Sequence, residues 1–228
     1  MLTTRALTEE QMDDPAISAA VYAQVLGDLA RVNTVTMARR PTLNFLRRLP
    51  QTSQPLRILE VGFGDGDMLR SISQWAVRHK IAVSLTGIDL NPRSAGIASA
   101  KTPTAMGIDY RTGDYAGLAG QGWDVVLSSL VAHHMQHDEL IAFLKFMEAE
   151  ARVGWFINDL HRHGFAWLGY PLLARIMRWH PIVRQDGQLS IARAFRPAEW
   201  RSILDEAGLS GARVQRVFPF RLCVEQIR

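Results

Sequence analysis

Cysteine is almost absent from the sequence, because Cys223 is the only one in 228 residues. The chain cannot form an internal disulfide, so a reducing compartment such as the cytoplasm is its expected location. No uncharged apolar stretch reaches the roughly 18 residues that a membrane-spanning helix needs. The first residues include acids and no apolar core, which argues against a signal peptide. With 47% hydrophobic residues and no low-complexity tract, the composition predicts a folded domain with a sizeable core.

Lysine is also scarce, since 23 of the 26 basic residues are arginine, and the net charge is +4. A sequence pI near 9.6 raises the question of a nucleic-acid or anionic-membrane partner. The basic residues, however, cluster no further than pairs such as Arg39-Arg40 and Arg47-Arg48. Because the sequence has no basic run, we expect no nucleic-acid partner.

The first fifty residues have a helical pattern. Asp14 followed by Pro15 is typical of a helix start, and apolar residues then recur at every third or fourth position. A polar linker, PQTSQP at 50–55, separates this part from the rest. We therefore predict an N-terminal helical cap over 1–50 and a main domain over 51–228.

From Arg57 onward, short apolar runs alternate with helical patterns. The expected strands cover 58–61, 81–90, 108–112, 123–131 and 153–159, and the expected helices cover 68–78, a stretch from Asp138, and 197–207. This alternation predicts an α/β fold, with a mostly parallel sheet whose ligands bind at the carboxyl ends of the strands. The last apolar runs, 212–218 and 221–227, are joined too tightly for a parallel crossover, so they either pair antiparallel or lie apart.

A glycine-rich loop follows the first strand and reads EVGFGDGD over 60–67. Glycines let the backbone approach a ligand closely where a strand turns into a helix. The spacing is GxGxG, whereas dinucleotide-binding loops have GxGxxG, and Asp67 stands at the third fingerprint position. Acids in this loop would repel a pyrophosphate but suit an amino group or a sulfonium. The loop therefore disfavours an NAD-dependent enzyme.

Two further acids stand at the ends of the next strands. Asp89 ends the second strand, where a carboxylate can accept hydrogen bonds from both hydroxyls of a ribose. Asp114 follows the third strand and can accept from an adenine amino group, with Tyr115 available to pack on the ring. Asp109 is the alternative to Asp114 on this strand.

Together these segments resemble the class I S-adenosylmethionine-dependent methyltransferases, of the bacterial small-molecule type. The resemblance runs from Ile58 to Asp159 and rests on ILEVGFGDG, GIDLN, GDY and DVVLSSLVAHHM. It implies a Rossmann-like, seven-stranded, mostly parallel sheet with an antiparallel C-terminal hairpin, helices on both faces and a helical cap. It also implies S-adenosyl-L-methionine as cofactor. The implied cofactor-binding residues are Glu60, Gly62, Gly64, Gly66, Asp89, Leu90, Asp114, Tyr115 and Ser129.

Three histidines, His133, His134 and His137, follow the fourth strand. The resemblance places His133 beside the methyl group, and an imidazole titrates in the right range to act as base for an oxygen nucleophile. The alternative is a helix entry in which His134 packs. The spacing is not HExxH, so we expect no metal.

A second polar run, NDLHRH at 158–163, follows the fifth strand. Asp159 is predicted to orient His161, which makes His161 a second candidate base, and a solvated turn is the alternative. The run resembles bacterial methyltransferases encoded near polyketide-type pathways, which implies secondary metabolism. Asp159, His134 and Trp167 are the predicted acceptor-binding residues.

Residues 164–183 are strongly apolar, and Leu168, Leu172, Ile176 and Trp179 share a helical face. This stretch is either a core helix or part of a lid over 164–195 that covers an apolar or aromatic acceptor. Its arginines could rest on an anionic membrane. The predicted function is methyl transfer to a phenolic or quinol-like hydroxyl of a small molecule. The alternatives are a nucleic-acid methyltransferase and a non-catalytic cofactor-binding partner subunit. The sequence does not indicate an oligomeric state.

Overall fold

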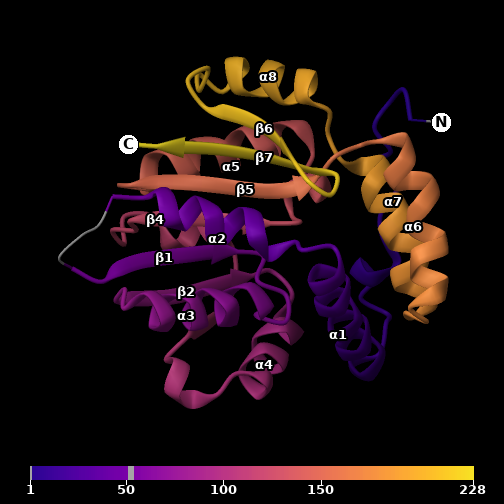
Figure 1. Cartoon of the computed structure of the whole chain (residues 1–228), viewed down its shortest axis with the longest axis horizontal. Coiled ribbons are helices and arrows are strands. Elements are labelled where there is room, and N and C mark those ends of the chain that lie inside the picture. Colours follow the sequence, from indigo (N-terminus) through magenta and orange to yellow (C-terminus); the bar gives the residue numbers. More distant parts are fainter. Residues whose placement is uncertain (1, 51–53) are drawn as a thin grey trace.

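Seven strands form a single sheet in the order β3-β2-β1-β4-β5-β7-β6 (Figure 1). The computed structural model describes residues 2–50 and 54–228, so residues 51–53 of the predicted linker lie outside the described part. All neighbouring strands are parallel except β7, which runs antiparallel to both β5 and β6. The strands are β1 Leu56–Val61, β2 Val83–Asp89, β3 Asp109–Thr112, β4 Val125–Ser129, β5 Gly154–Leu160, β6 Arg213–Val217 and β7 Arg221–Ile227. The predicted seven-stranded, mostly parallel sheet and its antiparallel C-terminal hairpin are confirmed.

Helices cover both faces of this sheet (Figure 1). The α-helices are α1 Ala19–Val35, α2 Arg39–Arg48, α3 Asp67–His79, α4 Pro92–Lys101, α5 His137–Glu150, α6 Gly164–Ile176, α7 Pro181–Arg193 and α8 Pro197–Glu206. Short 3-10 helices occur at η1 Gln11–Asp13, η2 Thr104–Met106, η3 Tyr115–Leu118 and η4 Ala132–His134. None of the helices in the described residues is long and apolar enough to cross a membrane.

Each face of the sheet has its own hydrophobic core. On one face, Phe143 of α5 and Trp200 of α8 pack with buried side chains of β4 and β5. On the other, Phe45 of α2 stacks on Phe156 of β5 with ring centroids 4.8 Å apart, next to side chains of α3. Because helices cover both faces, β4 and β5 are buried along almost their whole length.

A third, smaller cluster lies at the carboxyl edge of the sheet, where α1, α6 and α7 pack on one another (Figure 1). Its fully buried members are Val25, Ala174, Trp179 and Val183. The segment 164–183, read as one apolar stretch in the sequence, is divided between α6 and α7. Trp179 lies in the break between these helices and is buried, so it does not share the exposed face of Leu168 and Leu172.

The first long helix also begins later than its sequence signal suggests. The carboxylate of Asp14 accepts a hydrogen bond from the backbone N–H of Ala16, which closes a turn. Helix α1 then starts at Ala19, with Ser18 accepting from the backbone N–H of Val21 as its N-cap. Residues before Ser18 are therefore free to run across the edge of the sheet toward α7.

Candidate active site

The main cavity opens at the carboxyl ends of β1, β2 and β4 and has a volume of about 680 Å³. The glycine loop and the strand ends form its floor. Side chains of α1, α6 and α7 form its walls, and these walls are mostly apolar. A sheet of this topology is expected to bind its ligand at this edge. The described cavity is large enough for a nucleoside-sized cofactor and a second small molecule.

All three glycines of the loop have a backbone conformation that favours glycine, and two of them are also too closely packed for a side chain. Gly62, Gly64 and Gly66 have positive φ angles of 76°, 57° and 78°. A Cβ atom on Gly62 would lie 2.3 Å from Val131, and one on Gly66 would lie 2.4 Å from the Tyr110 hydroxyl. Gly62 and Gly64 line the cavity, whereas Gly66 supports the loop from behind as the N-cap of α3.

Asp89 stands at the centre of the predicted ribose position. Its Oδ2 accepts from the backbone N–H of Gly64 at 2.9 Å, and its Oδ1 accepts from the N–H of Asn91 at 2.9 Å. Burial raises the pKa of Asp89 above its usual value. The carboxylate therefore ties the glycine loop to the end of β2 while it lines the cavity.

Other predicted cofactor residues lie around this carboxylate, with one difference. Leu90, Tyr115 and Ser129 line the cavity. Asp114 does not, because its exposed carboxylate accepts from the backbone N–H of Ala116 and caps η3. Its role toward adenine stays a prediction.

The acids of the glycine loop differ in how they are balanced. Asp65 pairs with Lys101 at 2.9 Å, and Asp67 pairs with Arg39 at 3.0 Å. Glu60 is fully buried, and among the described residues it has no ion-pair partner and its Oε2 atom has no hydrogen-bond partner. Burial and the nearby Asp67 carboxylate raise the pKa of Glu60 well above its usual value. Glu60 is therefore ready to pair with a cationic group in the cavity.

An arginine that the sequence motifs did not indicate supplies the opposite charge. Arg221 begins β7, is buried and lines the cavity. Its Nη2 donates to the hydroxyl of Thr36 at 2.9 Å, but its Nη1 has no partner. A ligand with one ammonium and one carboxylate would satisfy Glu60 and Arg221 together. The amino-acid end of S-adenosylmethionine has both groups, so the described residues fit this cofactor.

His133 lies on η4, directly after β4, and is held by Asp159 at the end of β5. Its Nδ1 donates to Asp159 Oδ1 at 2.7 Å, and its backbone N–H donates to Asp159 Oδ2 at 2.9 Å. This pairing leaves Nε2 of His133 facing the carboxylate of Glu10, and both residues line the cavity. Asp159 thus orients His133, which corrects the expectation that it orients His161. The arrangement is that of a base and its orienting carboxylate.

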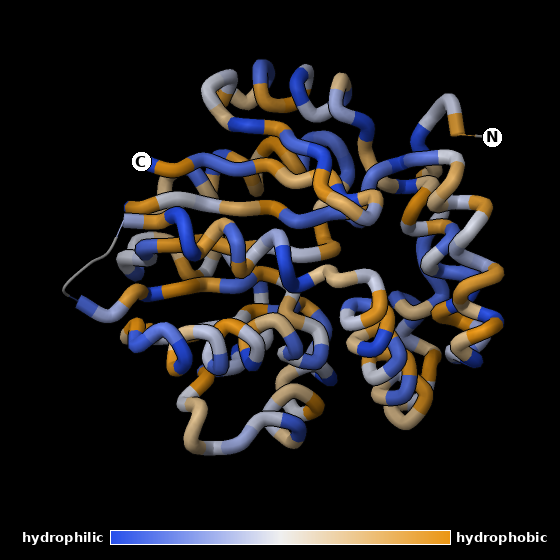
Figure 2. The backbone as a smooth tube through the Cα atoms, viewed as in Figure 1, coloured by the Kyte–Doolittle hydropathy of each residue, from blue (hydrophilic) through white to orange (hydrophobic). Residues whose placement is uncertain are grey.

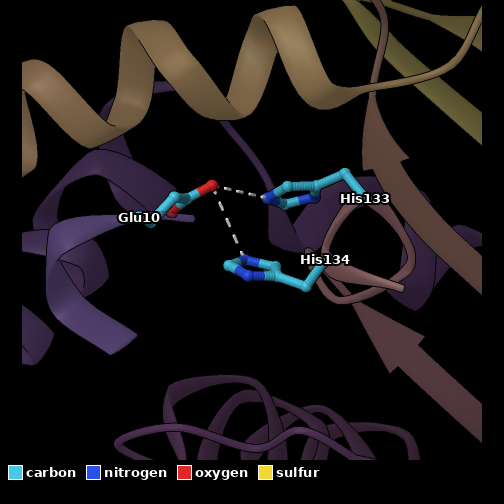
Figure 3. A group of neighbouring side chains, drawn as sticks. All are labelled: Glu10, His133 and His134. Carbon is cyan, nitrogen blue, oxygen red and sulfur yellow. Dashed lines mark ion pairs between the residues drawn. The ribbon is translucent and has the colours of Figure 1, made fainter. Parts of the chain in front are cut away.

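Glu10, from the segment before α1, faces the same imidazole (Figure 3). Its Oε1 lies 3.6 Å from Nε2 of His133 and 3.8 Å from Nε2 of His134, and it accepts from the Ser190 hydroxyl at 2.7 Å. Burial alone lowers the pKa of His133, but the carboxylates of Asp159 and Glu10 outweigh it and raise that pKa to about 9. No local motif marks Glu10, because it joins the site only through the fold.

Glu10, His133 and His134 also have the composition of a metal site, with ligand atoms within 4.8 Å of one another. In the structure the Glu10 carboxylate instead forms ion pairs with both imidazole rings (Figure 3). Ser190 already donates to the Glu10 oxygen that both rings face, and the buried Arg193 guanidinium donates to the backbone carbonyls of His133 and His134. A cation here would compete with the proton of His133. The expectation of no metal stays a prediction.

Two predicted residues lie away from the cavity. His161 is buried beyond β5, where its backbone N–H donates to the carbonyl of Phe220 and its ring lies near His163. Burial and nearby positive groups, Arg216 first, lower the pKa of His161 to about 4. Trp167 is half-buried on α6 outside the cavity lining, whereas Phe165 and Tyr170 of the same helix line it. The other acceptor-side residue, His134, does line the cavity, and its Nδ1 donates to Asp13 Oδ2 at 3.1 Å.

The sequence of residues 58–152 matches the family described as "Methyltransferase domain". This segment contains β1 to β4, the glycine loop, Asp89 and His133. No curated protein matches the sequence.

Solved structures with the same fold cover nearly the whole chain. The plantazolicin methyltransferase BpumL, in complex with S-adenosylhomocysteine, has a TM-score of 0.66 at 15% identity, over 95% of this chain and 91% of that one. The magnesium protoporphyrin IX methyltransferase of Synechocystis PCC 6803, with bound S-adenosylhomocysteine, has 0.57 at 19% identity, over 96% and 91%. An O-methyltransferase candidate from Nostoc punctiforme PCC 73102 has 0.65 at 15% identity, over 98% and 64%.

Proposed function

We propose that this chain, which belongs to the class I S-adenosylmethionine-dependent methyltransferases, transfers the methyl group to a hydroxyl oxygen of a small apolar acceptor. The observation that carries the proposal is the Asp159–His133 pair. Asp159 engages Nδ1 of the imidazole and leaves Nε2 to face Glu10, in a cavity lined both by the glycine loop and by apolar helices. The pair stands where the two substrates would meet.

Different residues of the cavity would bind different parts of the cofactor. Glu60 would hold the ammonium and Arg221 the carboxylate of its methionine part. Asp89 would accept from the ribose hydroxyls, and Leu90 and Tyr115 would flank the adenine. When bound, the cofactor supplies a methyl group already activated by its positively charged sulfur. Little further activation is needed, so the protein mainly aligns the acceptor oxygen with that methyl.

His133 would take the hydroxyl proton at Nε2 as the methyl group is transferred to the acceptor oxygen. Asp159 stabilises the resulting imidazolium through Nδ1, as an orienting carboxylate does beside other catalytic histidines. The carboxylates that raise the pKa of His133 also strengthen its neutral form as a proton acceptor for a phenol, whose pKa lies near 10. The acceptor hydroxyl would replace Glu10 as the partner of Nε2.

An apolar acceptor is proposed because Leu26, Leu29, Tyr170 and Leu173 line the cavity. Such walls favour aryl or alkyl groups over sugars. A nucleic-acid substrate is disfavoured because the arginines are dispersed along the chain. A non-catalytic partner subunit is disfavoured because the loop, Asp89 and the His133–Asp159 pair are all intact. A cytoplasmic role in secondary metabolism is part of the same proposal.

The test has two steps. Calorimetry should show binding of S-adenosylhomocysteine and none of NADH, and absence of heat with the former would contradict the cofactor assignment. The chain is then incubated with methyl-labelled S-adenosylmethionine and alkylphenols, alkylanilines and thiols of matched shape. We expect label in the phenol ethers. Transfer only to nitrogen, sulfur or carbon would overturn the oxygen assignment and leave the cofactor result intact.

A further inference from the structure

Helix α6 has one apolar face that nothing in the described structure covers. Phe165, Leu168, Leu172 and Ile176 are spaced at helical intervals along this face and are 65–75% exposed. The opposite face of α6 packs inward, with Ala174 fully buried against α1 and α7. Orange segments recur along the outer edge of α6 in Figure 2. A contiguous exposed stripe of this kind marks an interaction surface rather than scattered surface hydrophobics.

The stripe continues to the mouth of the cavity. Phe165 belongs to the stripe and also lines the cavity. Phe220, in the turn between β6 and β7, lines the cavity as well. The rings of His163 and Phe165 lie 5.6 Å apart, and those of His163 and Phe220 lie 5.1 Å apart. These three rings form an aromatic rim between α6 and the hairpin. An apolar molecule could therefore pass from the stripe into the cavity without crossing a charged surface.

Arginines without an ion-pair partner in the described residues lie near the C-terminal end of the stripe. Residues 164–184 contain Arg175, Arg178 and Arg184 and no acid. None of these three guanidinium groups forms an ion pair among the described residues. Arg175 and Arg184 line a second hollow of about 420 Å³ between α6 and α7. The Nε atom of Arg184 is buried there without a hydrogen-bond partner, so this hollow can receive an anionic oxygen.

We propose that the exposed face of α6, together with these arginines, docks the protein on an anionic lipid bilayer and positions the cavity mouth at the membrane surface. An exposed apolar helix face flanked by arginine is the pattern of helices that lie in the membrane interface. The arginines meet the lipid phosphates, and the stripe enters the boundary between headgroups and acyl chains. Docking of this kind lets an acceptor dissolved in lipid enter the cavity directly.

The test uses the full chain and vesicles of phosphatidylcholine, with or without phosphatidylglycerol, in a flotation assay without acceptor or cofactor. We expect binding to the anionic vesicles that weakens with salt. The double variant Leu172→Gln/Ile176→Gln should weaken binding at least tenfold, because it removes two inserted apolar side chains. Arg175→Gln/Arg178→Gln should weaken it about fivefold for each arginine removed.

Matched controls come from exposed residues elsewhere. Val77→Gln on α3, where Val77 is 76% exposed, and Arg47→Gln/Arg78→Gln on α2 and α3 should leave vesicle binding unchanged. Calorimetry with S-adenosylhomocysteine shows whether each variant keeps its folded cofactor site. Vesicle binding that all variants retain, or no binding at all, would overturn the proposal. This readout does not depend on the proposed reaction, so the two can fail separately.

Two other occupants of the surface are outcomes of the same experiment. Sedimentation that shows a dimer, lost in Leu172→Gln/Ile176→Gln, would mean that a second copy covers the stripe. Complete displacement from vesicles by free glycerol phosphate would mean that the arginine hollow is a site for a soluble phosphate. Either result would overturn membrane docking.

Discussion

The two sides of the cavity are built in different ways. The cofactor side consists of strand ends and a loop whose polar groups are fixed by short backbone contacts, such as those of Asp89 with Gly64 and Asn91. The acceptor side consists of α1, α6, α7 and the segment before α1, which share only a small cluster of buried apolar residues. The first side rests on the two main cores of the sheet, and the second packs mainly on itself.

This difference indicates a division of labour. A fixed cofactor is held by residues that the sheet positions, so binding energy and geometry come from the larger cores. The acceptor side can vary in shape without disturbing the sheet, as expected for the part that selects a substrate. His133 and Asp159 lie at the boundary between the cofactor side and the acceptor side. They come from the ends of sheet strands but face the proposed acceptor position.

The largest expected effect comes from removing the base at this boundary. His133→Ala should lower turnover about 100- to 10,000-fold while the affinity for S-adenosylhomocysteine stays unchanged, because the imidazole is not among the proposed cofactor contacts. Steady-state kinetics and calorimetry measure the two quantities separately. His161→Asn is the control and should keep its rate, since His161 lies outside the cavity. Equal losses in both variants would contradict the assignment of the base.

The next effect should be confined to the cofactor side. Asp89→Ala should weaken S-adenosylhomocysteine binding by about 100-fold, because it removes a charged acceptor of hydrogen bonds from the proposed ribose position. Calorimetry measures the change. Asp114→Ala is compared in parallel and should have a smaller effect, because Asp114 is exposed and does not line the cavity. A larger loss for Asp114→Ala would restore it as the main adenine contact.

The smallest effect concerns the pH dependence that the acceptor side imposes on His133. The base must be neutral to accept a proton, so kcat/KM should rise with pH and level off above about pH 9. Glu10→Gln removes one of the two carboxylates that raise this pKa, so the profile should move to lower pH by about one unit. Ser190→Ala, which keeps the carboxylate, should shift the profile less. If Glu10→Gln leaves the pH profile of kcat/KM unchanged, Glu10 does not contribute to the raised pKa of His133.

The cofactor side could be predicted because its signals are local in the sequence. The glycine loop directly follows β1, and Asp89 ends β2. Each signal therefore lies within a few residues of its own strand, and the tight turn after β1 requires glycine. The pairing of Asp159 was harder to predict. His161 is closer in sequence, but β4 and β5 are neighbours in the sheet, and Asp159 at the end of β5 contacts η4 directly after β4.

The acceptor side could not be assembled from the sequence, because its contacts join distant segments. Glu10 has no motif around it and acquires a role only by facing His133, more than a hundred residues later. The apolar pattern of 164–183 was compatible with a core helix or a lid, and the break before Pro181 divides the segment into two helices and buries Trp179. Hydrophobic periodicity identifies the apolar face of a helix, but it does not identify where one helix ends and the next begins.

The contacts between the segment before α1 and α7 have a consequence for the order of assembly. The backbone N–H of Ala6 donates to the carbonyl of Ala192, and those of Gln11 and Met12 donate to the carboxylate of Asp186. During synthesis, residues 6–12 leave the ribosome long before their partners exist. Glu10 can therefore accept the hydrogen bond of Ser190 only after α7 has been synthesised. The surroundings of the His133 imidazole are completed at that late stage, long after η4 itself has left the ribosome.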